Sequence, residues 1–116
     1  MVTAEAAPDI FEGMMPSPYM LFTHRVRPEW RERIPAVVHV DGSARVQTVQ
    51  RSDEPLVHRL LVEVGARIGA PVLVNKSLNT AGRPMVDDPR DALECFGSAP
   101  IDALVIGPFV VRRPRR

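Results

Sequence analysis

Residues 36–49, AVVHVDGSARVQTV, carry the strongest folding signal in the chain. Asp41 and Gly42 stand between two β-prone runs, and Asp-Gly is typical of tight hairpin turns because glycine tolerates a positive φ. After this turn, Arg45 and Gln47 alternate with apolar residues, which places both polar side chains on one face of a strand. The stretch therefore predicts a β-hairpin with a polar row along one face.

Two helices are predicted beyond the hairpin. The first covers about residues 53–68, with Ser52 or Asp53 as its cap and Gly69 just past its end. Its apolar stripe consists of Val57, Leu60, Leu61, Val64 and Ile68. The second covers DDPRDALECF, in which Asp88 is the expected cap and Pro89 fills the first helical position.

Three further stretches are expected to be strands. Residues 19–23 are β-prone, and PVLVN, residues 71–75, is continuously apolar, as in a central strand covered on both faces. IDALVIGPFVV, residues 101–111, supplies one or two closing strands interrupted at a Gly-Pro pair. Because helices and strands alternate, the predicted class is α/β or α+β around a mixed sheet, in a single domain.

Composition limits the possible roles of the chain. Its 116 residues fit one domain, and a net charge of +1 gives no general reason to expect binding to nucleic acid or membranes. We read residues 1–16 as a lead-in or linker remnant, residues 17–111 as the domain, and the arginine-rich residues 112–116 as a solvated basic tail that could also contact an anion. Cys95 is the only cysteine and is interpreted as core filler. Without a possible internal disulfide or a spanning apolar run, a cytoplasmic location is expected.

Polar groups that a core does not require gather in three places. The first is an arginine-rich loop containing Arg25, Arg27, Arg31 and Arg33, which either converges on a phosphate or carboxylate or is simply solvated. The second is Arg45, whose strand face lines a cleft or is open to water. The third is the group Asn75, Lys76, Ser77 and Asn79, placed where a buried strand ends. Ligands tend to bind at such ends in open α/β sheets, although Ser and Asn also build turns.

Other chemical signals are weak. His24, His39 and His58 are scattered along the chain, and each is interpreted as structural. We recognise no phosphate-binding glycine loop, metal-ligand spacing or Ser/His/Asp arrangement in the sequence.

Four blocks together resemble a known family. SPYMLFTHRVRPEWRERIPAVVHVDGSARVQTV, PVLVNKSLNTAGRPMV, DPRDALECF and IDALVIGPFVV resemble, in order and spacing, the C-terminal domain of O-carbamoyltransferases of the nodulation and antibiotic-biosynthesis type. The resemblance covers residues 17–111. It implies a YrdC-like fold, a twisted open mixed sheet flanked by helices, which binds ATP and carbamoyl phosphate and makes carbamoyl-adenylate. A larger Kae/actin-like domain then transfers the carbamoyl group to a hydroxyl.

The resemblance also gives roles to residues. Arg27 and Arg33 match basic positions before the hairpin and Arg45 matches the hairpin arginine, while Ser77 and Asn79 match an S-x-N element used at the nucleotide. We therefore assign catalysis to Arg27, Arg33, Arg45 and Lys76, and nucleotide binding to Asn75, Ser77 and Asn79. Mg²⁺ is expected to accompany ATP, although no dedicated protein cage for the ion is evident.

The chain departs from the family pattern in two side chains and in extent. Lys76 stands where the family usually has threonine, and Arg83 replaces a usual acidic residue, which changes the local field. The transfer domain is missing from the sequence.

Three functions are therefore expected as alternatives. The first is a stand-alone carbamoyl-adenylate-forming module of a split O-carbamoyltransferase in natural-product biosynthesis, which works with a separately encoded transfer domain or self-associates. The second is a pocket that acts alone on an anionic biosynthetic intermediate, with Lys76 in acid/base work if it is buried. The third is a non-catalytic binding or accessory subunit.

Overall fold

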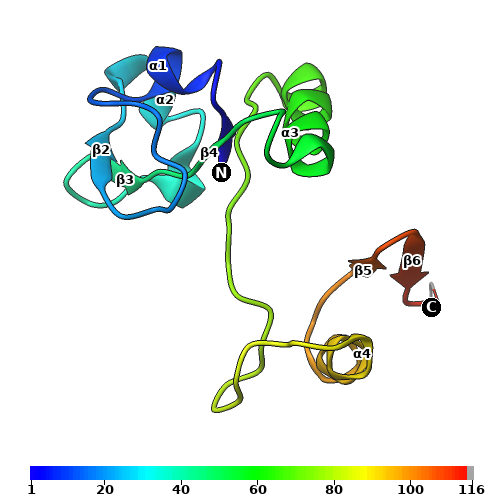
Figure 1. Cartoon of the computed structure of the whole chain (residues 1–116). Helices are drawn as coiled ribbons and strands as arrows, with labels where there is room; N and C mark the ends of the chain where they lie inside the picture. The colour runs from blue at the N-terminus through cyan, green and yellow to red at the C-terminus, as the bar shows by residue number, and fades with distance from the viewer. Residues whose placement is uncertain (115–116) are drawn as a thin grey trace. The chain divides into compact units, whose positions relative to one another are not determined.

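The computed structural model describes residues 1–114, which form two compact units. Unit 1 is Met1–Asn75 and unit 2 begins at Lys76. Unit 1 contains, in chain order, β1 (Val2–Thr3), α1 (Ala7–Ile10), β2 (Thr23–Arg25), α2 (Pro28–Arg31), the 3₁₀ turn η1 (Pro35–Val37), β3 (Ser43–Arg45), β4 (Thr48–Val49) and α3 (Pro55–Ile68) (Figure 1). Unit 2 contains α4 (Pro89–Ser98), β5 (Ala103–Ile106) and β6 (Phe109–Arg112).

The predicted mixture of helices and strands is confirmed, and the class is α+β. Among the described residues the strands pair in three two-stranded sheets: β1 with β4 in parallel, and β2 with β3 and β5 with β6 antiparallel. These strands are two to four residues long, so helices, turns and irregular segments build most of the chain. A continuous open sheet was expected from the resemblance, whereas the pairing found here is local.

The hairpin prediction is correct for the turn and wrong for the strand partner. Gly42 adopts a φ of +80°, and His39 N–H donates to Ser43 O at 2.7 Å across the turn. The run before the turn begins with the 3₁₀ turn η1 at Pro35 and does not continue as a strand. The strand after the turn, β3, pairs instead with β2, placing Arg45 opposite Thr23. The alternation itself is confirmed, since Val46 is buried between exposed Arg45 and half-buried Gln47.

Residues 1–16 are part of the core of unit 1, which corrects their interpretation as a linker remnant. Val2, Ala7, Ile10 and Phe11 are buried. They pack with residues of the arginine loop and of β3 in one apolar cluster. The sequence concealed this role because each element is only two to four residues long, too short to show a helical or strand period.

The segment PVLVN forms an edge rather than a central strand. Val72 makes an isolated antiparallel bridge with Val2, and Leu73 N–H donates to Met1 O at 3.0 Å. Val74 is 55% exposed, so the apolar run is not covered on both faces in unit 1. The predicted strand at residues 19–23 is also displaced, because β2 begins only at Thr23.

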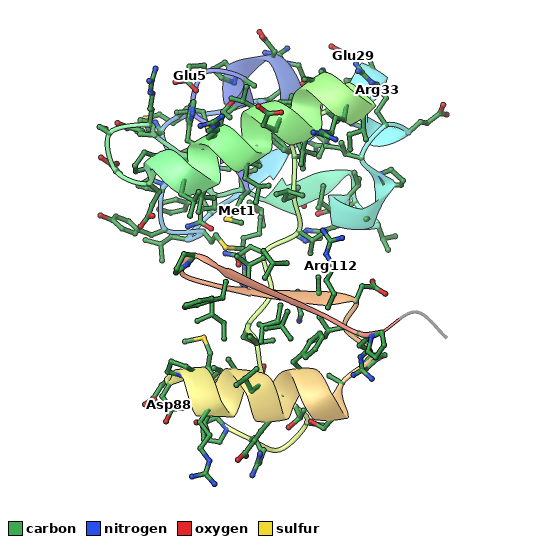
Figure 2. The ribbon with its side chains drawn as sticks, turned by 90° about the vertical axis from the view of Figure 1, so that its right-hand side faces the viewer. Met1, Glu5, Glu29, Arg33, Asp88 and Arg112 are labelled. Carbon is green, nitrogen blue, oxygen red and sulfur yellow. The ribbon has the colours of Figure 1, made fainter. Side chains whose placement is uncertain are left out.

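Helix α3 matches its predicted extent, but its apolar stripe is largely uncovered. The helix ends at Gly69, which has the left-handed φ of +76° expected of a C-terminal glycine. Its N-cap is Glu54, which makes no side-chain capping bond, rather than Ser52 or Asp53. Within the helix only Leu61 is buried. Figure 2 shows Glu5 and Arg33 toward opposite ends of this helix.

Unit 2 has a small core around α4. Asp88 caps the helix as predicted, because its carboxylate accepts from Asp91 N–H at 2.8 Å. Ala92, Phe96 and Leu104 form the buried cluster, and Cys95 is buried as expected of core filler. Strands β5 and β6 form the closing hairpin across Gly107 and Pro108.

The basic tail contains a structural residue. Arg113 donates to the carbonyl oxygens of Phe96 at 2.7 Å and Ala99 at 2.6 Å, and its guanidinium stands 5.3 Å from the centre of the Phe96 ring. Arg113 therefore binds the C-terminal end of α4 instead of being a freely solvated side chain. Arg115 and Arg116 lie outside the described residues.

Candidate functional site

A pocket of about 200 Å³ in unit 1 collects residues from separate sequence blocks. Its apolar floor consists of Val2, Phe11, Val37, Ala44, Val46 and Val72. Polar side chains on its lining include His39, Arg45 and Asn75. Ligand pockets of drug-sized molecules are commonly about 300–1,000 Å³, so this pocket suits a smaller molecule or one end of a larger one.

Arg45 lines the pocket together with its sequence neighbours Ala44 and Val46, at the end of β3. The strand alternates, so the neighbouring Ala44 and Val46 are buried while Arg45 is exposed. The Arg45 side chain makes no hydrogen bond or ion pair with any other residue in 1–114. Its guanidinium can therefore pair with an anion without losing an internal contact.

Asn75 is held at the pocket by Gln47, which follows Arg45 in the polar row of residues 45–47. Its Nδ2 donates to Gln47 Oε1 at 2.8 Å and contacts Met20 Sδ at 3.5 Å. The amide thus links a residue after the apolar run to the segment between β3 and β4, although the two lie 28 positions apart in the chain. Of the predicted site residues, Arg45 and Asn75 are the two that line this pocket.

The other predicted cations of unit 1 hold the backbone. Arg27 Nε donates to Pro8 O at 3.1 Å, and Arg33 Nη2 donates to Gly69 O at 2.6 Å. Arg33 also stacks on Trp30, with its guanidinium 3.8 Å from the ring centre. In the same loop, Arg31 Nε donates to Val26 O at 3.1 Å. The expectation that these arginines converge on one anion is not met within unit 1, because each points its donors at a different carbonyl.

The S-x-N element lies in unit 2 and organises a turn. Ser77 Oγ donates to Asn79 Oδ1 at 2.8 Å, and Asn79 Nδ2 donates to Arg83 O at 3.2 Å. Arg83 N–H in turn donates to Thr80 O at 3.0 Å, with Gly82 at a φ of +78°, as in a type II turn. The turn-building interpretation of Ser77 and Asn79 is therefore satisfied, and both side chains remain exposed to a ligand.

Lys76 and Arg83, the two departures from the family pattern, are both exposed. Lys76 makes no hydrogen bond or ion pair within the described chain, and unit 2 does not bury it as acid/base work by an amine would need. Arg83 Nη1 lies 3.7 Å from Glu94 Oε2, which connects the turn to α4.

Three carboxylates meet at the start of α4. Ligand oxygens of Asp87, Asp88 and Asp91 lie within 4.8 Å of one another and all three residues are exposed. Oxygen donors suit Mg²⁺, but the Asp88 carboxylate already accepts the capping bond of the helix. We assign no role in metal binding to this group.

A hydrogen-bonded series beside the pocket escaped the sequence analysis. Asp41 Oδ1 accepts from Ser43 Oγ at 2.7 Å and from Ser43 N–H at 2.9 Å. These hydrogen bonds, chiefly that from the Ser43 hydroxyl, lower the pKa of Asp41. His39 Nδ1 lies 3.0 Å from the same hydroxyl oxygen. The motif HVDGS contained the signal, because Asp and Ser at a glycine turn often bond to nearby backbone and side chains.

The structure thus defines an α+β chain with a small pocket rimmed by an arginine, an amide and an imidazole. A family model described as carbamoyltransferase C-terminus matches residues 1–113. The chain belongs to this carbamoyltransferase C-terminal family. The match includes residues 1–16, in agreement with their place in the core.

Curated relatives extend well beyond this sequence. The chain is 52% identical to nodulation protein U of Rhizobium tropici over 90 residues, which is 78% of the chain and 16% of that protein. Against nodulation protein U of Bradyrhizobium diazoefficiens the identity is 44% over 90 residues, again 16% of the relative. Nodulation protein NolO of the same organism is 38% identical over 112 residues, covering 94% of the chain and 20% of that protein. The chain therefore corresponds to a minor part of these relatives.

In the part of the chain that the structure describes, the helices are too short or too polar to cross a bilayer.

Proposed function

We propose that this chain is a carbamoyl-adenylate-forming part of an O-carbamoyltransferase, which combines ATP with carbamoyl phosphate. A separately encoded Kae/actin-like transfer domain would then pass the carbamoyl group to a hydroxyl of a natural-product substrate. The observation that carries the proposal is the unit 1 pocket, where Arg45 and Asn75 from two family-like blocks meet over an apolar floor. Membership of the carbamoyltransferase C-terminal family supports the same conclusion.

The pocket fits the smaller reactant. Carbamoyl phosphate joins an anionic phosphate to a neutral amide, and the rim offers a cation together with neutral polar groups. Its volume of about 200 Å³ favours carbamoyl phosphate or one end of ATP over a whole nucleotide. We retain Ser77 and Asn79 as proposed nucleotide contacts from unit 2, since both keep polar groups exposed. Arg27 and Arg33 donate instead to the backbone carbonyls of Pro8 and Gly69, which do not line the pocket.

The catalytic argument is electrostatic. Joining two anionic reactants requires cations that offset phosphate charge, and a positioned cation acts without a general base. Arg45 has its guanidinium available for this purpose. Water would cleave carbamoyl phosphate to carbamate and inorganic phosphate, and a carbamate oxygen would then attack the α-phosphorus of ATP, forming carbamoyl-adenylate and releasing pyrophosphate. Mg²⁺ would accompany the phosphates of ATP.

The test is an ATP–pyrophosphate exchange assay with Mg²⁺ and carbamoyl phosphate, run on the purified chain with and without a transfer domain from the nodulation-type relatives. Exchange should depend on carbamoyl phosphate and fall about 100-fold in Arg45→Ala, the typical loss when one charge-stabilising group is removed. Asn79→Ala should weaken exchange by raising the ATP concentration required. Arg59→Ala, an exposed arginine on α3, is the matched control. An exchange rate that is the same in Arg45→Ala and wild type would refute the proposal that this pocket binds the reactants.

A second candidate is a non-catalytic binding or accessory subunit. Arg27 and Arg33 bind backbone carbonyls, so of the predicted catalytic cations Arg45 is the one that lines the pocket. A single cation suits binding of an anion better than the joining of two anionic reactants. Binding of carbamoyl phosphate without any exchange, even with the transfer domain present, would identify this role. A product formed without ATP from another anionic intermediate would point to the third alternative, a pocket that acts alone.

A further inference from the structure

The rim of the unit 1 pocket contains the imidazole of His39, whose tautomer is set by hydrogen bonds with Ser43 and Asp41. Ser43 Oγ donates its single proton to Asp41 Oδ1 at 2.7 Å. The same oxygen lies 3.0 Å from His39 Nδ1 and can only accept in that contact. His39 must therefore carry its proton on Nδ1 and donate it to Ser43.

The remaining ring nitrogen is consequently an acceptor. In a neutral imidazole with Nδ1 protonated, Nε2 has a free lone pair. His39 is exposed and lines the pocket, so this lone pair is available to a ligand there. Ser43 is buried, and its backbone N–H also donates to Asp41 Oδ1. This second bond fixes the Asp41 carboxylate next to the Ser43 hydroxyl that contacts His39.

The Asn75 amide, like the His39 ring, also leaves an acceptor atom free. Its Nδ2 faces two acceptors, Gln47 Oε1 at 2.8 Å and Met20 Sδ at 3.5 Å. This places the donors of the amide on the protein and leaves Oδ1 for other partners. His39 and Asn75 thus bring two acceptors to a pocket that also holds the Arg45 cation.

Such a rim fits a particular combination of groups. The phosphate group of a monoester, once fully ionised, has only acceptor oxygens and gains no hydrogen bond from two further acceptors. An anion that also bears an N–H₂ group can pair its oxygens with Arg45 and its N–H donors with the two acceptors. A methyl group in place of N–H₂ would leave both acceptors without partners, which disfavours that analogue.

We propose that His39 Nε2 and Asn75 Oδ1 recognise the amide N–H₂ of the carbamoyl group, while Arg45 binds its phosphate. Asp41 and Ser43 are positioning residues that fix the His39 tautomer. The proposal rests on the function proposed above and adds to it the residues that select carbamoyl phosphate over acyl phosphates.

Stable analogues provide a direct test of this recognition. Phosphonoacetamide carries an N–H₂ where acetonylphosphonate carries a methyl group, and the two are otherwise alike. Calorimetric titration of the whole chain should give about tenfold tighter binding of phosphonoacetamide, as expected for one or two hydrogen bonds. Arg45→Gln should weaken both analogues by a similar factor.

Two variants of His39 separate recognition from folding. His39→Asn keeps a group near Nδ1 for the Ser43 contact but removes the acceptor at the Nε2 position, whereas His39→Gln reaches that position. The Asn variant should bring the affinity ratio close to one without lowering the melting temperature, and the Gln variant should retain part of the ratio. His58→Asn, on α3 and bonded to Glu5, is the control and should leave the ratio unchanged.

The outcomes are distinct from those of the exchange assay. A ratio that is the same in wild type and His39→Asn, or a wild-type ratio near one, overturns this inference even if exchange activity is present. Selective binding that depends on His39, with no exchange activity, supports the inference and rejects the proposed adenylate formation.

Discussion

Arg113→Ala should selectively destabilise unit 2. The guanidinium donates to carbonyls at and beyond the last turn of α4, at 2.7 Å to Phe96, 2.6 Å to Ala99 and, through Nε, 3.2 Å to Ile101. These contacts connect the helix to the segment that leads into β5. They matter because the buried cluster of this unit contains only Ala92, Phe96 and Leu104 among the described residues.

The magnitude follows from the exposure of these bonds. A hydrogen bond to a charged group contributes about 1.5–3 kcal/mol, and a cation at a helix C-terminus about 0.3–1 kcal/mol. Of these bonds only the one to Phe96 O is partly buried, so it dominates, and the exposed bonds add little. We expect the free energy of opening of unit 2 to fall by about 2 kcal/mol. Amides that exchange only when unit 2 opens should then exchange about 30-fold faster.

Hydrogen exchange of the full chain, followed by mass spectrometry, measures this effect. Peptides from α4, β5 and β6 should exchange faster in Arg113→Ala, while peptides from α3 stay unchanged. Arg112→Ala is the matched control because Arg112 is exposed on β6 and its side chain has no hydrogen bond within the described chain. Arg113→Lys should be intermediate, because lysine keeps the charge but loses the planar fork. Equal exchange rates in the Arg112→Ala and Arg113→Ala variants would refute the stabilising role of Arg113 at the C-terminal end of α4.

Three other predictions concern unit 1. Leu61→Ala should lower the free energy of unfolding by about 2–5 kcal/mol because the side chain is fully buried, whereas alanine at an exposed leucine of the same helix should cost under about 1 kcal/mol in denaturant titrations. Gly13→Ala should lower the melting temperature, since Gly13 has a φ of +112° and an added Cβ would lie 2.9 Å from His24 Nδ1; an unchanged melting temperature would contradict this backbone conformation. The hydrogen bond from His58 lowers the pKa of Glu5, so its stabilisation is present above the ordinary glutamate pKa of 4.5 and is lost as the pH falls through the depressed value. Because Glu5 is 66% exposed, the unfolding free energies of wild type and Glu5→Gln should differ by less than about 1 kcal/mol at pH 6 and converge at acid pH; a difference that grows toward acid pH would contradict this sign.

Local sequence chemistry predicted helices α3 and α4 and the glycine turns, although it missed α1 and the N-cap of α3. Asp88 caps α4, Gly69 ends α3 with a positive φ, and Gly42 occupies the predicted turn. Each of these features depends on bonds among neighbouring residues, so a short stretch of sequence contains all the information required. The same holds for the alternation that exposes Arg45 beside two buried neighbours.

Strand partners and the candidate site were harder to predict. The apolar run at residues 71–75 has a pattern that suits a central strand, yet it contacts β1 at an edge. Arg27 and Arg33 looked like ligand-binding cations, but their donors meet Pro8 O and Gly69 O. Composition cannot separate these cases, because an arginine that binds a phosphate and one that binds a carbonyl have the same side chain.

The class, the family, helices α3 and α4 and the glycine turns could be predicted from the sequence, since these follow from short-range bonding and from motifs at fixed spacing. The tertiary structure was needed to show which distant residues meet. It brought residues 1–16 into the core, joined Asn75 to Gln47, and set His39 on the pocket with Asp41 and Ser43 behind it. The physical reason is that contacts between distant segments depend on how all the apolar surfaces of the chain pack at once, which no local pattern specifies.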